Sequence, residues 1–585
     1  MKWPQVPAAW TAGAFLILMA LLAGGAALRE SVTYDEVAHI GAGVSYWQQL
    51  DLRLDEEHPP LAKMVAALPL VLTGVRAEYS HSSWRVSERL FSANAGQLFF
   101  GEMLLKHWND PKTTLVLARL PMLALTLLLG WVVFLYAREI GGPWGGALST
   151  AVYATTPLFL GFGPLVLTDV PAALLALLTL CAAASVWRMP STRNAVWLGL
   201  SLSGALLTKF TGLILLPALA VFVVTMWPGW RSQRMRAVIT SIGVAAIGVY
   251  VFYLVFSWNQ PAAAGRMIMP VWLYLRGVYL VALTASRPTY LFGHAYTTGE
   301  WFYFPALLML KSAIGFLVLL RVAAFGKVSK ESAAHWRLLW IAWGLFTIVC
   351  LASKLDIGFR HFSVPLVLLI VMLAPLARTA GRARRVLVVT CVAQCVIAAV
   401  AAYPFYLTYA NAIGSFWPHY ELFNDSNLDW DQSLPALGQF VNERGIASIG
   451  LDHFGYTDAR VSVPQSRIWN CERPSPEDAG QWVAVSANMI SQLRNCRWLL
   501  AGHYETLAGG SLYAVKLPRV IPSIPNPGEF FRTDGADSRR LFVDFVRDPS
   551  IVEKSAAESE RIFTQWSAQS SVPQAIAAWL RDGSR

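Results

Sequence analysis

About eleven long apolar segments constrain this chain more than any other feature of its sequence. A membrane-spanning helix needs about 20 mostly apolar residues, because each residue adds about 1.5 Å to a helix that crosses about 30 Å of hydrocarbon. The predicted spans cover 9–28, 113–136, 144–162, 165–186, 195–208, 211–227, 237–257, 302–322, 338–353, 361–377 and 386–409. Only 14% of the residues are charged, against about 25% in soluble domains. The sequence therefore predicts an all-α polytopic membrane domain.

Basic residues in the short loops predict the orientation of these spans. Lys and Arg collect in cytoplasmic loops, and the clusters are Arg188 and Arg193; Arg231, Arg234 and Arg236; Arg321, Lys327, Lys330 and Arg337; and Arg378, Arg382, Arg384 and Arg385. All of them are cytoplasmic if the N-terminus is cytoplasmic. The net charge of +11 then follows from this rule, and we expect no nucleic-acid partner. The first apolar segment lacks a small-residue cleavage site, which favours a retained span over a signal peptide.

The composition changes after residue 410, which divides the chain into two predicted domains. Residues 1–410 form the membrane domain, with a large non-cytoplasmic loop at 29–112, and 411–585 form a small extracytoplasmic α/β domain. Short apolar runs at 447–451 and 497–501 indicate strands, and helices are expected near 433–444 and 572–581.

The six cysteines fall into two groups. Four lie in predicted spans, where cysteine packs as a small apolar residue. Cys471 and Cys496 lie in the extracytoplasmic domain, where the compartment permits a disulfide. The sequence leaves open whether these two are bridged, and no Cys/His spacing indicates a zinc site.

Acids and cations gather at the non-cytoplasmic ends of the predicted spans. Under this topology the clusters are Asp35 and Glu36, 55–63, 168–171, 208–210, 293–305 and 353–361. Any single one is explained by solvation or snorkelling at the interface. Six clusters on one side indicate a shared site, because charges near a membrane are costly and tend to be paired. Carboxylates there could deprotonate an acceptor or hold a metal, and Lys or Arg could neutralise a phosphate.

Several of these segments resemble membrane glycosyltransferases of the GT-C class. They are Asp35-Glu36, His58-Pro-Pro-Leu-Ala-Lys63, Thr168-Asp-Val-Pro171, Gly299-Glu-Trp-Phe-Tyr-Phe-Pro305 and Ser353-Lys-Leu-Asp-Ile-Gly-Phe-Arg-His361. They resemble in particular glycosyltransferase family thirty-nine, which includes protein O-mannosyltransferases and the aminoarabinose transferases that modify lipid A. The 424–432 stretch, Asn-Asp-Ser-Asn-Leu-Asp-Trp-Asp-Gln, also resembles bacterial members. The resemblance runs from about residue 30 to 440.

The resemblance implies an inverting transfer of a sugar from a polyprenyl-phosphate carrier to a lipid, glycan or protein acceptor, in a bacterial inner membrane. Carried onto this chain, it implies Asp35 as general base or acceptor-orienting acid, with Glu36 beside it. It also implies that Asp169 orients the acceptor or the first loop, although an acid favoured by the helix dipole explains that position as well.

The cations of these segments are the expected donor-phosphate ligands. Lys209, Lys354 and Arg360 lead this group, followed by Lys63, Arg287 and His361. A divalent metal bound by Glu57 or His58 is a further expectation from the resemblance, with a structural Glu-His-Pro turn as the alternative. The competing functional hypotheses are a polytopic lipid or solute transporter, which predicts charged groups near the bilayer midplane and internal symmetry, and a non-catalytic membrane subunit.

Overall fold

The structure is a computed structural model that describes residues 7–87, 94–226, 232–261, 265–284, 286–323, 332–378, 381–455, 457–493 and 496–521. The helix expected near 572–581 lies outside these residues, as do Arg231, Lys327 and Lys330.

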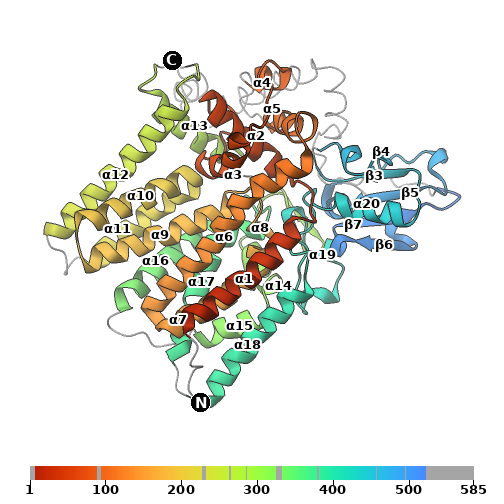
Figure 1. Cartoon of the computed structure of the whole chain (residues 1–585). Coiled ribbons are helices and arrows are strands. Elements are labelled where there is room, and N and C mark those ends of the chain that lie inside the picture. Colours follow the sequence, from red (N-terminus) through yellow and green to blue (C-terminus); the bar gives the residue numbers. More distant parts are fainter. Residues whose placement is uncertain are drawn as a thin grey trace.

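Within the described residues, seven helical segments are long and apolar enough to cross a membrane. They are α1 (Ala8–Ala27), α6 (Pro111–Gly141), α9 (Asp169–Arg188), α12 (Ser232–Phe256), α16 (Ala333–Leu351), Phe359–Arg378 with α17 (Ser363–Val371) at its centre, and α18 (Arg382–Ala401). Each coincides with a predicted span. The chain is a multi-pass membrane protein built from packed helices (Figure 1).

The other four predicted spans are shorter or interrupted. The 144–162 run divides into α7 (Pro143–Ala154) and α8 (Pro157–Phe162), and 195–208 is the 17-residue α10 (Thr192–Thr208). The 211–227 run begins as a 3-10 helix, Phe210–Ile214, before α11 (Leu215–Thr225). The 302–322 run bends by 115° between α14 (Tyr303–Leu310) and α15 (Ile314–Ala323). Hydropathy alone therefore located these segments without revealing their breaks.

The first loop carries its own helices. α2 (Tyr34–Gln49) and α3 (Leu61–Leu72) pack against each other, followed by α4 (Ser82–Ser87), α5 (Asn94–Glu102) and a π-helix at Met103–His107. α13 (Met269–Thr284) and the hairpin of β1 (Thr289–Leu291) and β2 (His294–Tyr296) come later in the chain. α2–α5 lie at the end of the helical bundle away from the N-terminus, next to the C-terminal sheet (Figure 1).

The C-terminal region is an α/β unit. Its sheet has the order β4-β3-β5-β7-β6, formed by β3 (Ile449–Asp452), β4 (Ser466–Ile468), β5 (Trp482–Ser486), β6 (Tyr504–Leu507) and β7 (Leu512–Lys516). β3 is parallel to β4 and β5, whereas β7 is antiparallel to β5 and β6. α20 (Leu434–Glu443) coincides with the helix expected near 433–444 and packs its apolar side on the sheet core.

Two expectations for this region have clear outcomes. The strand expected at 497–501 is wrong, because Arg497–Ala501 forms a 3-10 helix; a short apolar run does not distinguish a strand from a buried helical turn. Cys471 and Cys496, which the sequence left open, form a disulfide with Cα atoms 5.5 Å apart.

Candidate active site

Four predicted site residues from distant parts of the sequence meet in one charged network. The Lys209 Nζ lies 2.5 Å from Asp169 Oδ1, and the Arg360 Nη1 lies 3.5 Å from Asp169 Oδ2. The same Arg360 nitrogen lies 2.9 Å from Asp35 Oδ2. Asp169 is buried, whereas the side chain of Asp35 remains 23% exposed. Two cations and two carboxylates thus share one site, with Asp35 nearest to solvent.

Local folding rules place the two acids. Thr33 and Glu36 form a capping box at the start of α2, which fixes Asp35 in the first helical turn. Asp169 is in the first turn of α9, two residues before Pro171, where a negative charge is favoured by the helix dipole and proline is tolerated.

The two cations stand at helix breaks. Lys209 has an extended backbone between α10 and the 3-10 helix Phe210–Ile214. Arg360 lies in the 3-10 helix Phe359–Phe362 that precedes α17. Its Nε is buried and has no hydrogen-bond partner within the described part of the chain.

Glu36 is adjacent to Asp35 but has a different environment. Its carboxylate accepts hydrogen bonds from Arg119 Nε and Nη2 at 2.9 and 2.5 Å and from the Val166 amide at 2.9 Å. Thr33 donates to it from both its amide and its hydroxyl. Burial raises the pKa of Glu36, but the Arg119 guanidinium and these hydrogen bonds together bring it below its ordinary value. This fully paired carboxylate joins the first loop to α6, and the geometry favours a structural role over a catalytic one.

Lys63 is likewise fully occupied. Its ammonium lies 3.1 Å from Asp55 Oδ2 and donates to the Tyr46 hydroxyl and to the carbonyls of Asp55 and His58. Burial alone would raise the pKa of Asp55. The positive charges of Lys63 and His39 outweigh this effect and hold the pKa below its ordinary range. Lys63 therefore stabilises the 55–63 turn, and its contacts do not leave it facing a donor phosphate.

Of the two residues expected to hold a metal, only His58 belongs to a group of possible metal ligands. His58 Nδ1 and His39 Nε2 each lie 3.4 Å from an oxygen of Asp55, and these three side chains bring their ligand atoms within 4.8 Å of one another. Glu57 is not in this group. Burial raises the pKa of its carboxyl group above the ordinary value. The Lys63 ammonium already provides a positive charge at Asp55, so the donor set does not fit a resident cation well.

The remaining predicted phosphate ligands differ in position. His361 is half-buried and interacts electrostatically with Lys209, Arg360 and Asp169, so it belongs to the network. Lys354 and Arg287 have exposed side chains, and their backbones are joined by a hydrogen bond from the Arg287 amide to the Lys354 carbonyl. They lie on a surface segment, from which Arg287 interacts electrostatically with Asp425 and Glu57.

Two features of the site were not assigned from the sequence. Arg119 is a single charge inside an apolar run, a signal that could have marked it as a paired residue. The Trp430 ring lies 4.0 Å from the Arg360 guanidinium carbon. Trp430 belongs to the 424–432 stretch, which resembled bacterial family members without an assigned role.

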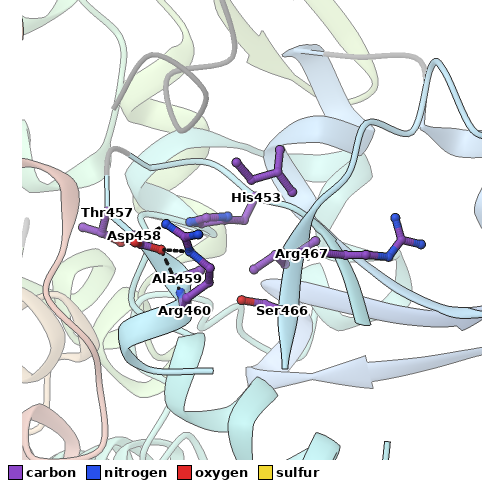
Figure 2. A pocket seen from close by; sticks show the side chains of 9 residues that line it. His453, Thr457, Asp458, Ala459, Arg460, Ser466 and Arg467 are labelled. Carbon is purple, nitrogen blue, oxygen red and sulfur yellow. Dashed lines mark hydrogen bonds and ion pairs between the residues drawn. The ribbon is translucent and has the colours of Figure 1, made fainter. Parts of the chain in front are cut away.

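A small pocket also opens in the C-terminal region, lined by His453 and by residues of 457–460 and 466–468 (Figure 2). Its two arginines are already paired, Arg460 with Asp458 and Arg467 with Asp478. In Figure 2 the Arg467 guanidinium points away from Arg460. The pocket therefore lacks the converging cations of the Asp169 network.

Residues 112–258 match the family described as dolichyl-phosphate-mannose-protein mannosyltransferase. This part of the chain is similar to protein mannosyltransferases. The matched segment runs from α6 to just beyond α12 and includes Asp169 and Lys209, and it confirms the predicted resemblance to polyprenyl-phosphate-dependent glycosyltransferases. A search of curated proteins finds no match.

The chain is also similar to three solved structures, at low sequence identity. ArnT from Cupriavidus metallidurans, bound to undecaprenyl phosphate, is 14% identical, with 86% of this chain and 97% of that chain covered and a TM-score of 0.46. AglB from Archaeoglobus fulgidus, with an inhibitory peptide and a dolichol-phosphate, is 11% identical, with 83% and 70% covered and a TM-score of 0.44. The Pmt1-Pmt2 complex of S. cerevisiae, bound to the sugar donor, is 19% identical, with 44% and 34% covered and a TM-score of 0.34. This chain thus spans about a third of the yeast chain that it matches.

Proposed function

We propose that this protein transfers a sugar from a polyprenyl-phosphate carrier to a lipid, glycan or protein acceptor on the non-cytoplasmic face of a bacterial inner membrane. The observation that carries the proposal is the network in which Arg360 bridges Asp35 and Asp169 while Lys209 pairs with Asp169. The orientation follows from the basic loops, with the N-terminus cytoplasmic and the C-terminal domain outside.

The cations act on the leaving group. As the bond between the anomeric carbon and the phosphate oxygen breaks, negative charge develops on the lipid phosphate, and fixed positive groups stabilise that charge. Arg360 has an unused Nε for this purpose, and a guanidinium matches the geometry of phosphate oxygens. Lys209 supplies a second, compact charge. Asp169 holds both cations in place.

Asp35 acts on the acceptor. It is the more exposed carboxylate of the network, so an acceptor hydroxyl entering from solvent reaches it first. As general base it takes the hydroxyl proton while the oxygen attacks the anomeric carbon opposite the phosphate, which gives inversion. An acceptor phosphate needs no deprotonation, and Asp35 then serves to orient it.

The expected divalent metal remains a proposal without an assigned step. Neither Glu57 nor the cluster of His58 with His39 and Asp55 is given a role in the mechanism, because the Lys63 ammonium already lies 3.1 Å from Asp55 Oδ2. Dialysis of purified protein against EDTA, followed by the transfer assay and by metal analysis of the protein, tests this proposal. Full activity of a metal-free sample would remove the metal from the mechanism.

The experiment for the function uses purified full-length protein in nanodiscs, radiolabelled polyprenyl-phosphate sugars and a panel of acceptors. Wild-type protein should release labelled acceptor, whereas Asp35→Asn should transfer at least 100-fold more slowly, the usual contribution of a general base being about 100-fold or more. Glu78→Gln is the matched control, because Glu78 is an exposed acid of the same loop. Equal rates for Asp35→Asn and Glu78→Gln would refute the role of Asp35.

The same preparation distinguishes transfer from transport. A transporter would move the labelled lipid or solute between compartments of a proteoliposome without forming a new glycosidic bond. Labelled lipid that crosses the membrane with no labelled acceptor from any member of the panel would favour the transporter over the glycosyltransferase.

A further inference from the structure

The 424–432 segment lies in the chain between the last span, α18, and the C-terminal sheet, and it contacts the backbone around Arg360. The Phe359 amide donates to Asn427 Oδ1 at 2.8 Å, and the Ser426 hydroxyl donates to the Ile357 carbonyl at 2.7 Å. Gly358 permits this approach, since a Cβ there would lie 2.0 Å from Ser426 Oγ. The segment therefore fixes the chain immediately before the Arg360 side chain.

The same segment also holds the start of α2. The Tyr34 amide donates to the Trp430 carbonyl at 3.1 Å, and the Ser31 amide donates to the Gln432 carbonyl at 3.0 Å. The Ser31 hydroxyl donates to the Asp431 carbonyl at 2.6 Å. One short segment thus fixes the backbones that carry both members of the Asp35–Arg360 ion pair.

Trp430 is the side chain of this segment that touches the charged network. Its ring is 2% exposed and lies under the Arg360 guanidinium at 4.0 Å. A desolvated arginine over a tryptophan face is among the stronger cation–π contacts. The ring covers one face of the guanidinium and leaves the hydrogen-bonding N–H groups at its edge, of which Nη1 pairs with Asp35 and Asp169 and Nε has no partner within the described residues. Because Arg360 also has two carboxylate neighbours, the ring limits how far the guanidinium can turn toward either.

The C-terminal region holds the segment from its other side. Asn488 Oδ1 accepts the Asp425 amide at 2.7 Å, and Asn488 Nδ2 donates to the Asp429 carbonyl at 2.8 Å. The Phe454 ring stacks on Tyr34 with ring centroids 5.4 Å apart. Phe454 and Asn488 follow β3 and β5, at the carboxyl ends of parallel strands. The carboxyl ends of these parallel strands, where α/β units commonly bind their ligands, therefore face the active site.

We propose that Trp430 is a positioning residue for the donor phosphate: it orients the Arg360 guanidinium, and the C-terminal region supports catalysis by holding the 424–432 segment through Asn488. This inference rests on the proposed function and assigns to the C-terminal region a part in the active site. Trp430 itself need not touch the substrate.

The test measures the affinity of the full-length protein in nanodiscs for polyprenyl phosphate without its sugar, together with the transfer rate. Trp430→Met removes the π face and should weaken phosphate binding about 30-fold, the upper range for a buried cation–π contact. Trp430→Phe keeps a smaller π face and should stay within about fivefold of wild type. Trp482→Met is the control, because Trp482 packs on Phe440 in the C-terminal region and should bind as wild type does.

The Met and Phe variants separate positioning from packing, since both remove volume and only one removes the aromatic face. Equal affinities of Trp430→Met and Trp430→Phe, or an equal loss in Trp482→Met, would overturn the inference. Asn488→Ala is the second variant and remains informative if Trp430→Met does not fold. It should weaken phosphate binding in the same direction and act non-additively with Trp430→Phe; wild-type affinity in Asn488→Ala would contradict the role of the C-terminal region.

The outcome for wild-type protein distinguishes this inference from the proposed function. If wild type does not bind polyprenyl phosphate, the proposed function fails and the inference fails with it. If wild type binds the lipid and transfers sugar while Trp430→Met does both equally well, only the inference fails.

Discussion

Replacing Glu36 by Gln separates the structural acid of the first loop from the proposed catalytic acid beside it. Glu36 is fully buried and receives five hydrogen bonds from Arg119, Val166 and Thr33. A Gln side chain has one oxygen to accept them and places an amide N–H₂ against the remaining donors. Removing one partner of a buried ion pair costs about 3–5 kcal/mol.

The lower end of this range applies here, because the Arg119 guanidinium also donates to the carbonyls of Ala27, Glu30 and Ser31. We therefore expect Glu36→Gln to lower the free energy of unfolding by about 3 kcal/mol. The assay is reversible SDS unfolding in mixed micelles followed by circular dichroism. Glu139→Gln is the matched control: the Glu139–Arg188 pair is 35% and 49% exposed, and a pair at the surface contributes about 0–1 kcal/mol.

The activity of the folded fraction completes the test. Glu36→Gln should transfer sugar at close to the wild-type rate per folded molecule, whereas Asp35→Asn should transfer at least 100-fold more slowly per folded molecule. A stability loss no larger than that of Glu139→Gln, or an inactive but fully stable Glu36→Gln, would refute the structural assignment and return Glu36 to the catalytic group.

Three further predictions concern the C-terminal region and its contact with the site. Burial raises the pKa of Asp425 to about 6, so the folded state binds a proton that the unfolded chain has lost above about pH 4. The free energy of unfolding of the wild type should therefore fall as the pH rises from about 4 to 6, and it should fall less steeply in Asp425→Asn. Equal slopes of unfolding free energy against pH in the two proteins would contradict this prediction. The Cys471–Cys496 disulfide spans 25 residues, so Cys471→Ser should lower the free energy of unfolding by about 3–4 kcal/mol in a chemical denaturation series, and an unchanged midpoint would show that the bridge adds no stability. Gly358→Ala places a Cβ 2.0 Å from Ser426 Oγ and should cost about 1–3 kcal/mol; the double variant with Ser426→Ala should recover part of that loss in the same assay, and no recovery would refute the steric explanation.

The sequence predicted the membrane domain well where a single helix carries an unbroken apolar run. It did not reveal the bend at 302–322, where a charged residue, Lys311, interrupts the apolar run. The Lys311 ammonium, between α14 and α15, donates to the carbonyls of Leu407 and Asn427. Hydropathy averages over such a residue and records only the apolar neighbours.

The candidate site shows the same division. The pattern of charges at span ends correctly selected Asp35, Asp169, Lys209 and Arg360 as residues that meet. The pattern could not show which acids and cations form ion pairs with a structural role, so it placed Glu36 and Lys63 in the same group as these four residues. Ion pairs are set by tertiary contacts. Asp35 and Glu36 are adjacent in the sequence, but Asp35 pairs with Arg360 and Glu36 pairs with Arg119.

The most direct test of the central claim is an experimental structure of the full-length protein with bound polyprenyl phosphate. The account predicts that the phosphate oxygens lie within hydrogen-bonding distance of Arg360 and Lys209, with the Asp35 carboxylate facing the side from which an acceptor enters. A phosphate bound away from this network, for example at Arg382, Arg384 and Arg385 in the first turn of α18, would contradict it.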